Sequence, residues 1–153
     1  MNLQEIPQVC SDVDVGKEVE KIIEIAITIR GLFLNILKAS TYTDNTNGSC
    51  AYACYFAKYA LDKFTDFRTA YRGGDGNGDG GYIDAHGNFH GHYWLEVLTA
   101  AGSYIIDITA DQFGDKPVVV LALNQTSHYV AGCQKTVDEH FTDFLAPLAS
   151  HFE

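Results

Sequence analysis

Three residues whose side chains combine in covalent catalysis are spread through the chain: Cys50, His92 and Asp107. Cys50 closes the sequence "NGSC", His92 opens "HYWLEV", and Asp107 ends "SYIID". An imidazole can take the proton of a neighbouring thiol, and a carboxylate behind the imidazole fixes its tautomer and stabilises the charged ring. A strand that only had to bury one face would carry Val, Thr or Tyr at the histidine and aspartate positions. The three residues therefore suggest a nucleophile, a base and an orienting acid.

Cys50 stands where a helix is expected to begin. Apolar residues at helical spacing follow the polar stretch "STYTDNTNGS" and predict a helix from Cys50 to about Phe64. Unpaired N–H groups and the dipole at a helix N-terminus favour a thiolate and offer donors to an oxyanion. Cys54, one turn further along, has neither advantage and is expected to pack as a small hydrophobic residue.

His92 and Asp107 are predicted to lie on neighbouring strands of a hairpin. A turn centred between Ala100 and Ala101 places Asp107 opposite Trp94 and diagonal to His92. A turn at Thr99 and Ala100 places Asp107 directly opposite His92 instead. Both registers put the two side chains on the same face, because strand side chains alternate with a period of two, and only a bulge would separate them.

These segments together resemble the transglutaminase-like core of the papain-like cysteine enzymes. The pattern is "GSC" at the start of a helix, then "FRTAYRGG" as the first strand, then "HxWxE" and "DxT" on the next two strands. It follows the family's chain order over roughly residues 45 to 112. The resemblance implies an α+β, papain-like fold in which helices pack on a central antiparallel sheet and the cysteine begins a helix.

The resemblance also implies the roles of the site residues: Cys50 as nucleophile, His92 as base and Asp107 as orienter. The implied reaction is hydrolysis or deamidation of an amide, either a peptide bond or a glutamine side chain, through a thioester and without a cofactor or metal. The aromatic residue that often follows the family's cysteine is Ala51 here. Asn47 is the one candidate for an oxyanion side chain before Cys50. Trp94 is a candidate for the cleft, although packing explains it equally well.

Two other functions are consistent with the residues. In "HGNFHGH", His86, His90 and His92 could ligate the zinc of a hydrolase, with Asp107 or a water completing the site, but this leaves the placement of Cys50 unexplained. The same fold could also serve as a catalytically inactive binding domain.

The loop 73–81 has a sequence that imitates the start of an EF-hand calcium loop. Asp75, Asn77 and Asp79 precede Gly80, but the twelfth position is His86 instead of Glu, and no paired helices flank the loop. A flexible loop that borders the site as a lid is the alternative.

The elements that must position these residues follow from periodicity and turn signals. A first helix is expected over about 13–38, capped by Ser11 and Asp14, and a strand over "FRTAYR". Strands are expected near 89–98, 103–109 and 117–123. A last helix carries Phe141, Phe144, Leu145 and Leu148 on one face, with Pro147 as a kink or stop. Residues 1–153 are expected to form a single domain.

Composition limits the partners. The 20 acidic and 10 basic residues give a formal net charge of -10, which would repel nucleic acid and acidic lipid, so a protein or peptide substrate is expected, and a basic one suits the charge best. The longest apolar run, 22–29, is too short to span a bilayer. Without a basic and apolar leader, the protein is expected in the cytoplasm, or exported by a route that needs no cleavable signal peptide. The four cysteines form no CxxC pair and suggest neither a disulfide framework nor a zinc ribbon.

Overall fold

The protein combines helices with short antiparallel strands. The computed structural model describes residues 12–43 and 45–150. Its helices are α1 (Asp12–Thr41), α2 (Cys50–Phe64) and α3 (Gln134–Ser150), with 3-10 turns η2 (Ala110–Phe113) and η3 (Leu123–Gln125). Its strands are β1 (Arg68–Gly74), β2 (Gly81–Ile83), β3 (Phe89–His90), β4 (His92–Thr99), β5 (Gly102–Asp107), β6 (Val119–Ala122) and β7 (Tyr129–Val130). The predicted α+β class is confirmed.

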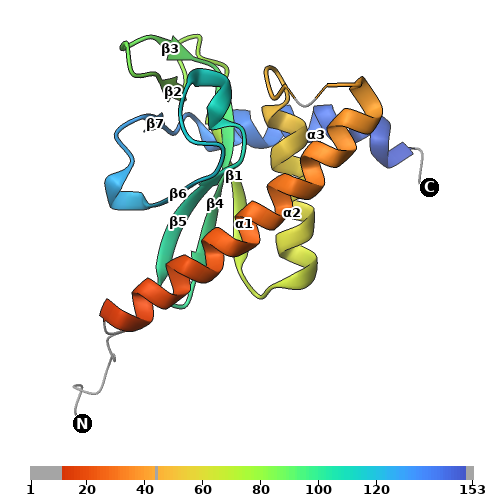
Figure 1. Cartoon of the computed structure of the whole chain (residues 1–153). Coiled ribbons are helices and arrows are strands. Elements are labelled where there is room, and N and C mark those ends of the chain that lie inside the picture. The colour runs from red at the N-terminus through yellow and green to blue at the C-terminus, as the bar shows by residue number, and fades with distance from the viewer. Residues whose placement is uncertain (1–11, 44, 151–153) are drawn as a thin grey trace.

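The strands form two antiparallel sheets (Figure 1). The larger sheet has the order β1-β4-β5-β6, and the smaller one has the order β3-β2-β7. In Figure 1, α1 runs diagonally across the molecule beside α2, and the small sheet lies at one end of the large one. The large sheet is therefore the platform on which the other elements pack.

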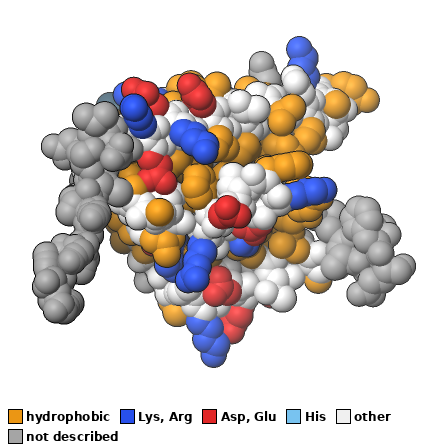
Figure 2. Space-filling view, turned by 90° about the horizontal axis from the view of Figure 1, so that it is seen from below, with side chains coloured by type: hydrophobic (Ala, Val, Ile, Leu, Met, Phe, Trp, Pro, Cys, Tyr) orange, Lys and Arg blue, Asp and Glu red, His pale blue; other side chains and the backbone are white. Residues whose placement is uncertain are grey.

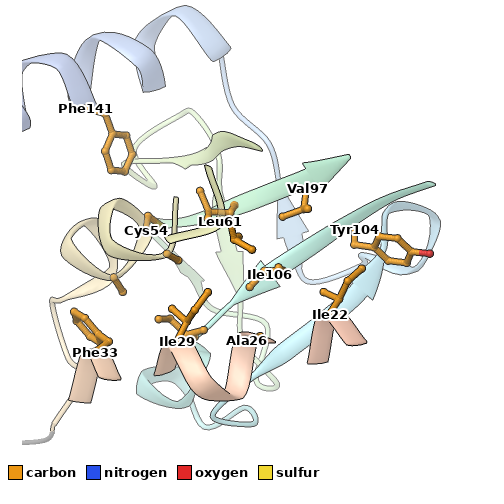
Figure 3. Packing of buried hydrophobic residues seen from close by; sticks show 14 of the residues in the cluster. Ile22, Ala26, Ile29, Phe33, Cys54, Leu61, Val97, Tyr104, Ile106 and Phe141 are labelled. Atoms are coloured by element: carbon orange, nitrogen blue, oxygen red, sulfur yellow. The ribbon is translucent and has the colours of Figure 1, made fainter. Parts of the chain in front are cut away.

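The main core lies between the helices and one face of the large sheet (Figure 3). The buried face of α1 carries apolar residues at the spacing expected of an amphipathic helix. With residues of α2, of α3 and of the inner face of β4 and β5 they form one cluster. Its members include Ile22, Ala26, Ile29, Phe33, Cys54, Leu61, Leu95, Val97, Ile106 and Phe141. The stacked rings of Tyr71 on β1 and Phe141 on α3, 3.8 Å apart, join the last helix to this core.

The opposite face of the large sheet carries the other set of alternate residues. Trp94 of β4 and Ile105 of β5 are buried there with Tyr82 of β2 and Tyr129 of β7. The small sheet thus covers this face, and it covers the end of β4 at which His92 lies. His92 contacts the Tyr82 ring edge-on, with centroids 5.9 Å apart.

The structure corrects three predicted elements. The strand expected over 89–98 is divided at Gly91 between the two sheets, since a Cβ at Gly91 would lie 2.5 Å from the Asp75 carbonyl oxygen and no larger residue fits there. The strand expected over 103–109 ends at Asp107, because the Thr109 N–H turns back to the Asp107 side chain. Pro147 does not stop the last helix, which continues to Ser150.

Other predictions agree with the structure or fall outside it. Helices over 13–38 and from Cys50, and a strand over "FRTAYR", are confirmed within a few residues. The expected caps Ser11 and Asp14 lie outside the residues and side chains described. No helix in the described part of the chain is long and apolar enough to cross a membrane. Figure 2 shows one face of the surface, where apolar side chains lie among charges of both signs.

Candidate active site

His92 and Asp107 form a buried pair at one end of the large sheet. His92 Nε2 lies 2.7 Å from Asp107 Oδ2, and the two side chains are 0% and 1% exposed. The strand pairing Leu95 with Ile106 places the turn at Ala100 and Ala101, which is the first of the two registers considered. Asp107 consequently lies diagonal to His92, and the predicted shared face is confirmed.

Asp107 receives donors on both carboxylate oxygens. The Tyr129 hydroxyl donates to Oδ2 at 2.9 Å, and the Thr109 backbone N–H donates to Oδ1 at 2.9 Å. The Thr109 hydroxyl makes a longer contact of 3.4 Å with Oδ1. These donors satisfy both oxygens of a carboxylate that burial removes from water. Asp107 is therefore suited to hold a protonated imidazole.

The second ring nitrogen of His92 is left available to the thiol of Cys50. His92 Nδ1 is buried and forms no hydrogen bond to nitrogen or oxygen among the described residues. Burial lowers the pKa of His92, but the charge and hydrogen bond of Asp107 outweigh it, and the neighbouring Cys50 adds to them, so the pKa rises to about 9. In the neutral ring, Nε2–H faces Asp107 and the Nδ1 lone pair lies on the Cys50 side, where it can accept a proton.

Cys50 is the first residue of α2 and is partly exposed. The residue before it, Ser49, is of a type that commonly caps helices, yet its hydroxyl donates to the Thr46 carbonyl at 2.7 Å and makes no cap bond to α2. The N–H groups of the first turn of α2 are therefore not capped by Ser49, and they point in the direction that stabilises an oxyanion beside Cys50.

Cys54 has the packing role that was predicted. It is buried in the main core, and burial raises its thiol pKa well above the ordinary value, with Cys50 and Asp107 adding to the effect. Cys54 also lines a small cavity with Ala53 and Asp107, which shows how closely the first turns of α2 approach the end of β5.

The loop before Cys50 is fixed by side chains that the sequence did not single out. Asp111 of η2 accepts from the Thr46 hydroxyl at 2.8 Å and from both guanidinium nitrogens of Arg30 at 3.1 and 2.8 Å. The next residue, Gln112, accepts from the Gly48 N–H at 3.2 Å. The segment "TADQF" therefore ties the strand of the acid to the loop of the nucleophile. Asp111 and Gln112 could have been suspected as site residues because they follow Asp107 closely in the sequence.

The two further site candidates differ in exposure. Asn47 is exposed, and its backbone N–H donates to the Asn45 side chain at 2.9 Å. Trp94 is 2% exposed and packs edge-on against Tyr129 at 5.0 Å. Trp94 therefore packs on the covered sheet face, on the same side of β4 as His92, whose ring centroid lies 6.1 Å away.

The structure does not assemble the alternative zinc site. His90 Nε2 pairs with Asp84 Oδ2 at 2.8 Å in the small sheet, whereas His92 is held by Asp107 in the large one, and His86 is exposed. Among the described residues, no group of three His, Cys, Asp or Glu side chains is placed to hold a metal ion.

The Gly/Asp loop is a compact turn whose carboxylates bind backbone amides. Asp75 Oδ1 accepts from the Asn77 N–H, and Asp79 Oδ1 accepts from the Cys133 N–H, each at 2.8 Å. The glycines are needed where backbones cross, because a Cβ at Gly74 would lie 2.3 Å from the Gly80 nitrogen. This turn supports the end of β1, where Gly74 pairs with His92.

Comparison with protein-family models, curated proteins and solved structures finds no match for this chain. The site is therefore interpreted from its own geometry and chemistry.

Proposed function

We propose that this protein hydrolyses or deamidates an amide through a thioester, with Cys50 as nucleophile, His92 as base and Asp107 as orienting acid. The observation that carries the proposal is the buried His92–Asp107 pair, whose free Nδ1 lies beside a thiol at the start of a helix. A histidine needed only for packing would have no reason to keep one nitrogen unbonded in the interior.

The reaction follows from the positions of the groups. His92 Nδ1 takes the Cys50 proton, and the thiolate attacks the amide carbonyl, while the carbonyl oxygen becomes an oxyanion held by the first N–H groups of α2. The tetrahedral species collapses to a thioester, and the leaving amine or ammonia takes the proton from the His92 imidazolium. His92 then deprotonates a water molecule, which attacks the thioester. The bond to Cys50 breaks, and the carboxylic acid product is released while the thiolate of Cys50 is restored.

The resemblance of the sequence to the transglutaminase-like core supports the same proposal. The helix that begins at Cys50, the strand of His92 and the strand of Asp107 occur in that family's order and pack as helices on an antiparallel sheet. We therefore propose a papain-like fold with a peptide bond or a glutamine side chain of a protein as the substrate. A catalytically inactive binding domain with this fold remains the competing function.

The decisive experiment measures how fast each cysteine of the folded protein reacts with iodoacetamide. We expect Cys50 to be alkylated at neutral pH at least about tenfold faster than the buried Cys54, because a neighbouring base generates the thiolate. His92→Ala should remove this advantage, and His90→Ala is the matched control that should preserve it. Exposed Cys133 provides the reference for an accessible thiol without a neighbouring imidazole. It is a demanding reference, because hydrogen bonds from Thr136 and Lys135 at the start of α3 lower its pKa. Cys50 labelling no faster than Cys133 labelling would contradict the proposal and favour a binding domain.

A further inference from the structure

Tyr129 reaches the site from the small sheet. It lies on β7, is 6% exposed, and donates its hydroxyl hydrogen to Asp107 Oδ2 at 2.9 Å. The same oxygen receives His92 Nε2 at 2.7 Å. One carboxylate oxygen therefore serves two donors, one from the imidazole and one from a phenol on a different sheet.

We propose that Tyr129 is a positioning residue for the reaction, acting on His92 through Asp107. A donor on Oδ2 fixes the carboxylate in the plane that meets Nε2 and takes up part of its negative charge. Because the charge is shared with the Tyr129 hydroxyl, Asp107 attracts the proton of His92 Nε2 less strongly and stabilises the imidazolium less. Tyr129 thereby keeps His92 able to release its proton to a leaving amine.

Tyr129 is the side chain that shares the Asp107 oxygen bound by His92, so it can influence the pKa of His92. The titratable groups that face His92 are Asp107 from β5, Cys50 from α2 and Tyr82 from β2, and the rings of Trp94 and Phe113 complete the packing. Burial, the charge of Asp107 and the hydrogen bond to it all raise the pKa of Tyr129. Its hydroxyl therefore remains protonated, and a hydrogen-bond donor, over the pH range in which thiols titrate.

Tyr82 provides a matched control. It is the direct strand partner of Tyr129, it is 2% exposed, and its ring packs against His92. Its hydroxyl donates to Asp115 instead of Asp107. Replacing either tyrosine by phenylalanine removes one buried hydroxyl at neighbouring positions of the same sheet, but only Tyr129→Phe removes a donor from Asp107.

The experiment is an NMR titration of the histidine ring nitrogens in the wild type, Tyr129→Phe and Tyr82→Phe. We expect Tyr129→Phe to raise the His92 pKa by about one unit, the effect of losing one hydrogen bond to a charged group, and Tyr82→Phe to leave it unchanged. In protein that already carries Asp107→Asn, adding Tyr129→Phe should change the His92 pKa much less than Tyr129→Phe does in the wild type. Equal shifts in the two tyrosine variants, or none in Tyr129→Phe, would overturn the proposal.

The inference takes its catalytic meaning from the proposed function, but its test does not depend on activity. If Cys50 proves unreactive while Tyr129→Phe shifts His92 as expected, the thiol chemistry fails and the coupling stands. If Cys50 is reactive and His92 does not respond, the coupling alone fails. Should Tyr129→Phe not fold, wild-type protein grown with 3-fluorotyrosine applies the same test with a stronger donor. The His92 pKa should then fall, and an unchanged value would reject the proposal.

Discussion

Asp107 is the residue on which the site and the local structure both depend. Its Oδ2 accepts from His92 and Tyr129, and its Oδ1 accepts from Thr109. An amide in its place has only one accepting oxygen, so its NH2 group must face a donor on one side or the other. The residue that orients the imidazole therefore also connects the two sheets.

We accordingly predict that Asp107→Asn impairs both reactivity and stability. The alkylation rate of Cys50 should fall by about 10²-fold, because His92 loses the partner that sets its tautomer and charge. The free energy of unfolding should fall by about 1–3 kcal/mol, the usual cost of an unsatisfied buried polar group. Asp115→Asn, which changes a carboxylate that does not face His92, is the control. If Cys50 of the Asp107→Asn variant is alkylated as fast as in the wild type while the midpoint of unfolding is lowered, Asp107 serves the fold alone.

The residues of the pair could be predicted from the sequence, whereas the residues around them could not. Parity along the strands and the small-residue turn between them were enough to place His92 and Asp107 on one face, since an even register error leaves the face unchanged. Tyr129 and Asp111 act across long sequence separations through a few side-chain hydrogen bonds, and no periodic pattern marks such contacts. The burial of Trp94 could not be predicted either, because nothing in β4 itself shows that its outer face is covered.

At the scale of elements, the connection between α1, η2 and the loop before α2 sets the position of the nucleophile. Arg30 binds Asp111 together with the carbonyls of Ile108 and Pro117, at 2.7 and 3.0 Å. A single guanidinium thus joins the long helix to the segment that follows the acid strand, and Asp111 passes this constraint to Thr46.

Asp111→Ala is predicted to loosen this connection. Unfolding should become easier by about 1–3 kcal/mol, because the partly buried Arg30 loses its charged partner. Cys50 alkylation should slow several-fold, since the loop no longer holds the thiol beside His92. Lys135→Ala, which removes a pair with Glu139 that is 84% and 63% exposed, should change neither measurement. If Asp111→Ala lowers the midpoint of unfolding but leaves the alkylation rate of Cys50 unchanged, this connection supports the fold without positioning Cys50.

The large sheet was predictable at this scale and the small one was not. Strands β1, β4 and β5 are six to eight residues long and rich in β-branched and aromatic residues, which makes them recognisable as strands. Strands β2, β3 and β7 contain only two or three residues each, fewer than any periodicity needs. Gly91 appeared to continue one strand, although it is the point at which the chain passes from one sheet to the other.

For the whole molecule, the buried pair makes stability depend on pH. The His92 pKa of about 9 in the folded state lies above its ordinary value of 6.5, so folding favours the protonated ring. This contribution is fully present below pH 6.5 and is lost as the pH rises through 9. The other buried groups with raised pKa values, Cys54, Tyr82 and Tyr129, have ordinary pKa values of 9.0 for the thiol and 10.0 for the phenols, so they affect stability above this range.

We therefore predict that the free energy of unfolding falls by about 1–3 kcal/mol between pH 6.5 and 9. Urea denaturation at a series of pH values measures it. The slope should be much smaller in His92→Gln and unchanged in His90→Gln, whose partner Asp84 lies between β2 and β3. A wild-type protein with constant stability over this interval would show that His92 is neutral when folded.

The small sheet is completed by β7, which lies late in the sequence and is therefore synthesised late. A growing chain emerges from the ribosome with its thiol, imidazole and carboxylate already synthesised, but Tyr129 and the core residue Phe141 come later. Until they arrive, the outer face of β4 and β5 is uncovered and the acid lacks its second donor. The proposed site is therefore completed last, and an unfinished chain carries Cys50, His92 and Asp107 without the hydrogen bond of Tyr129.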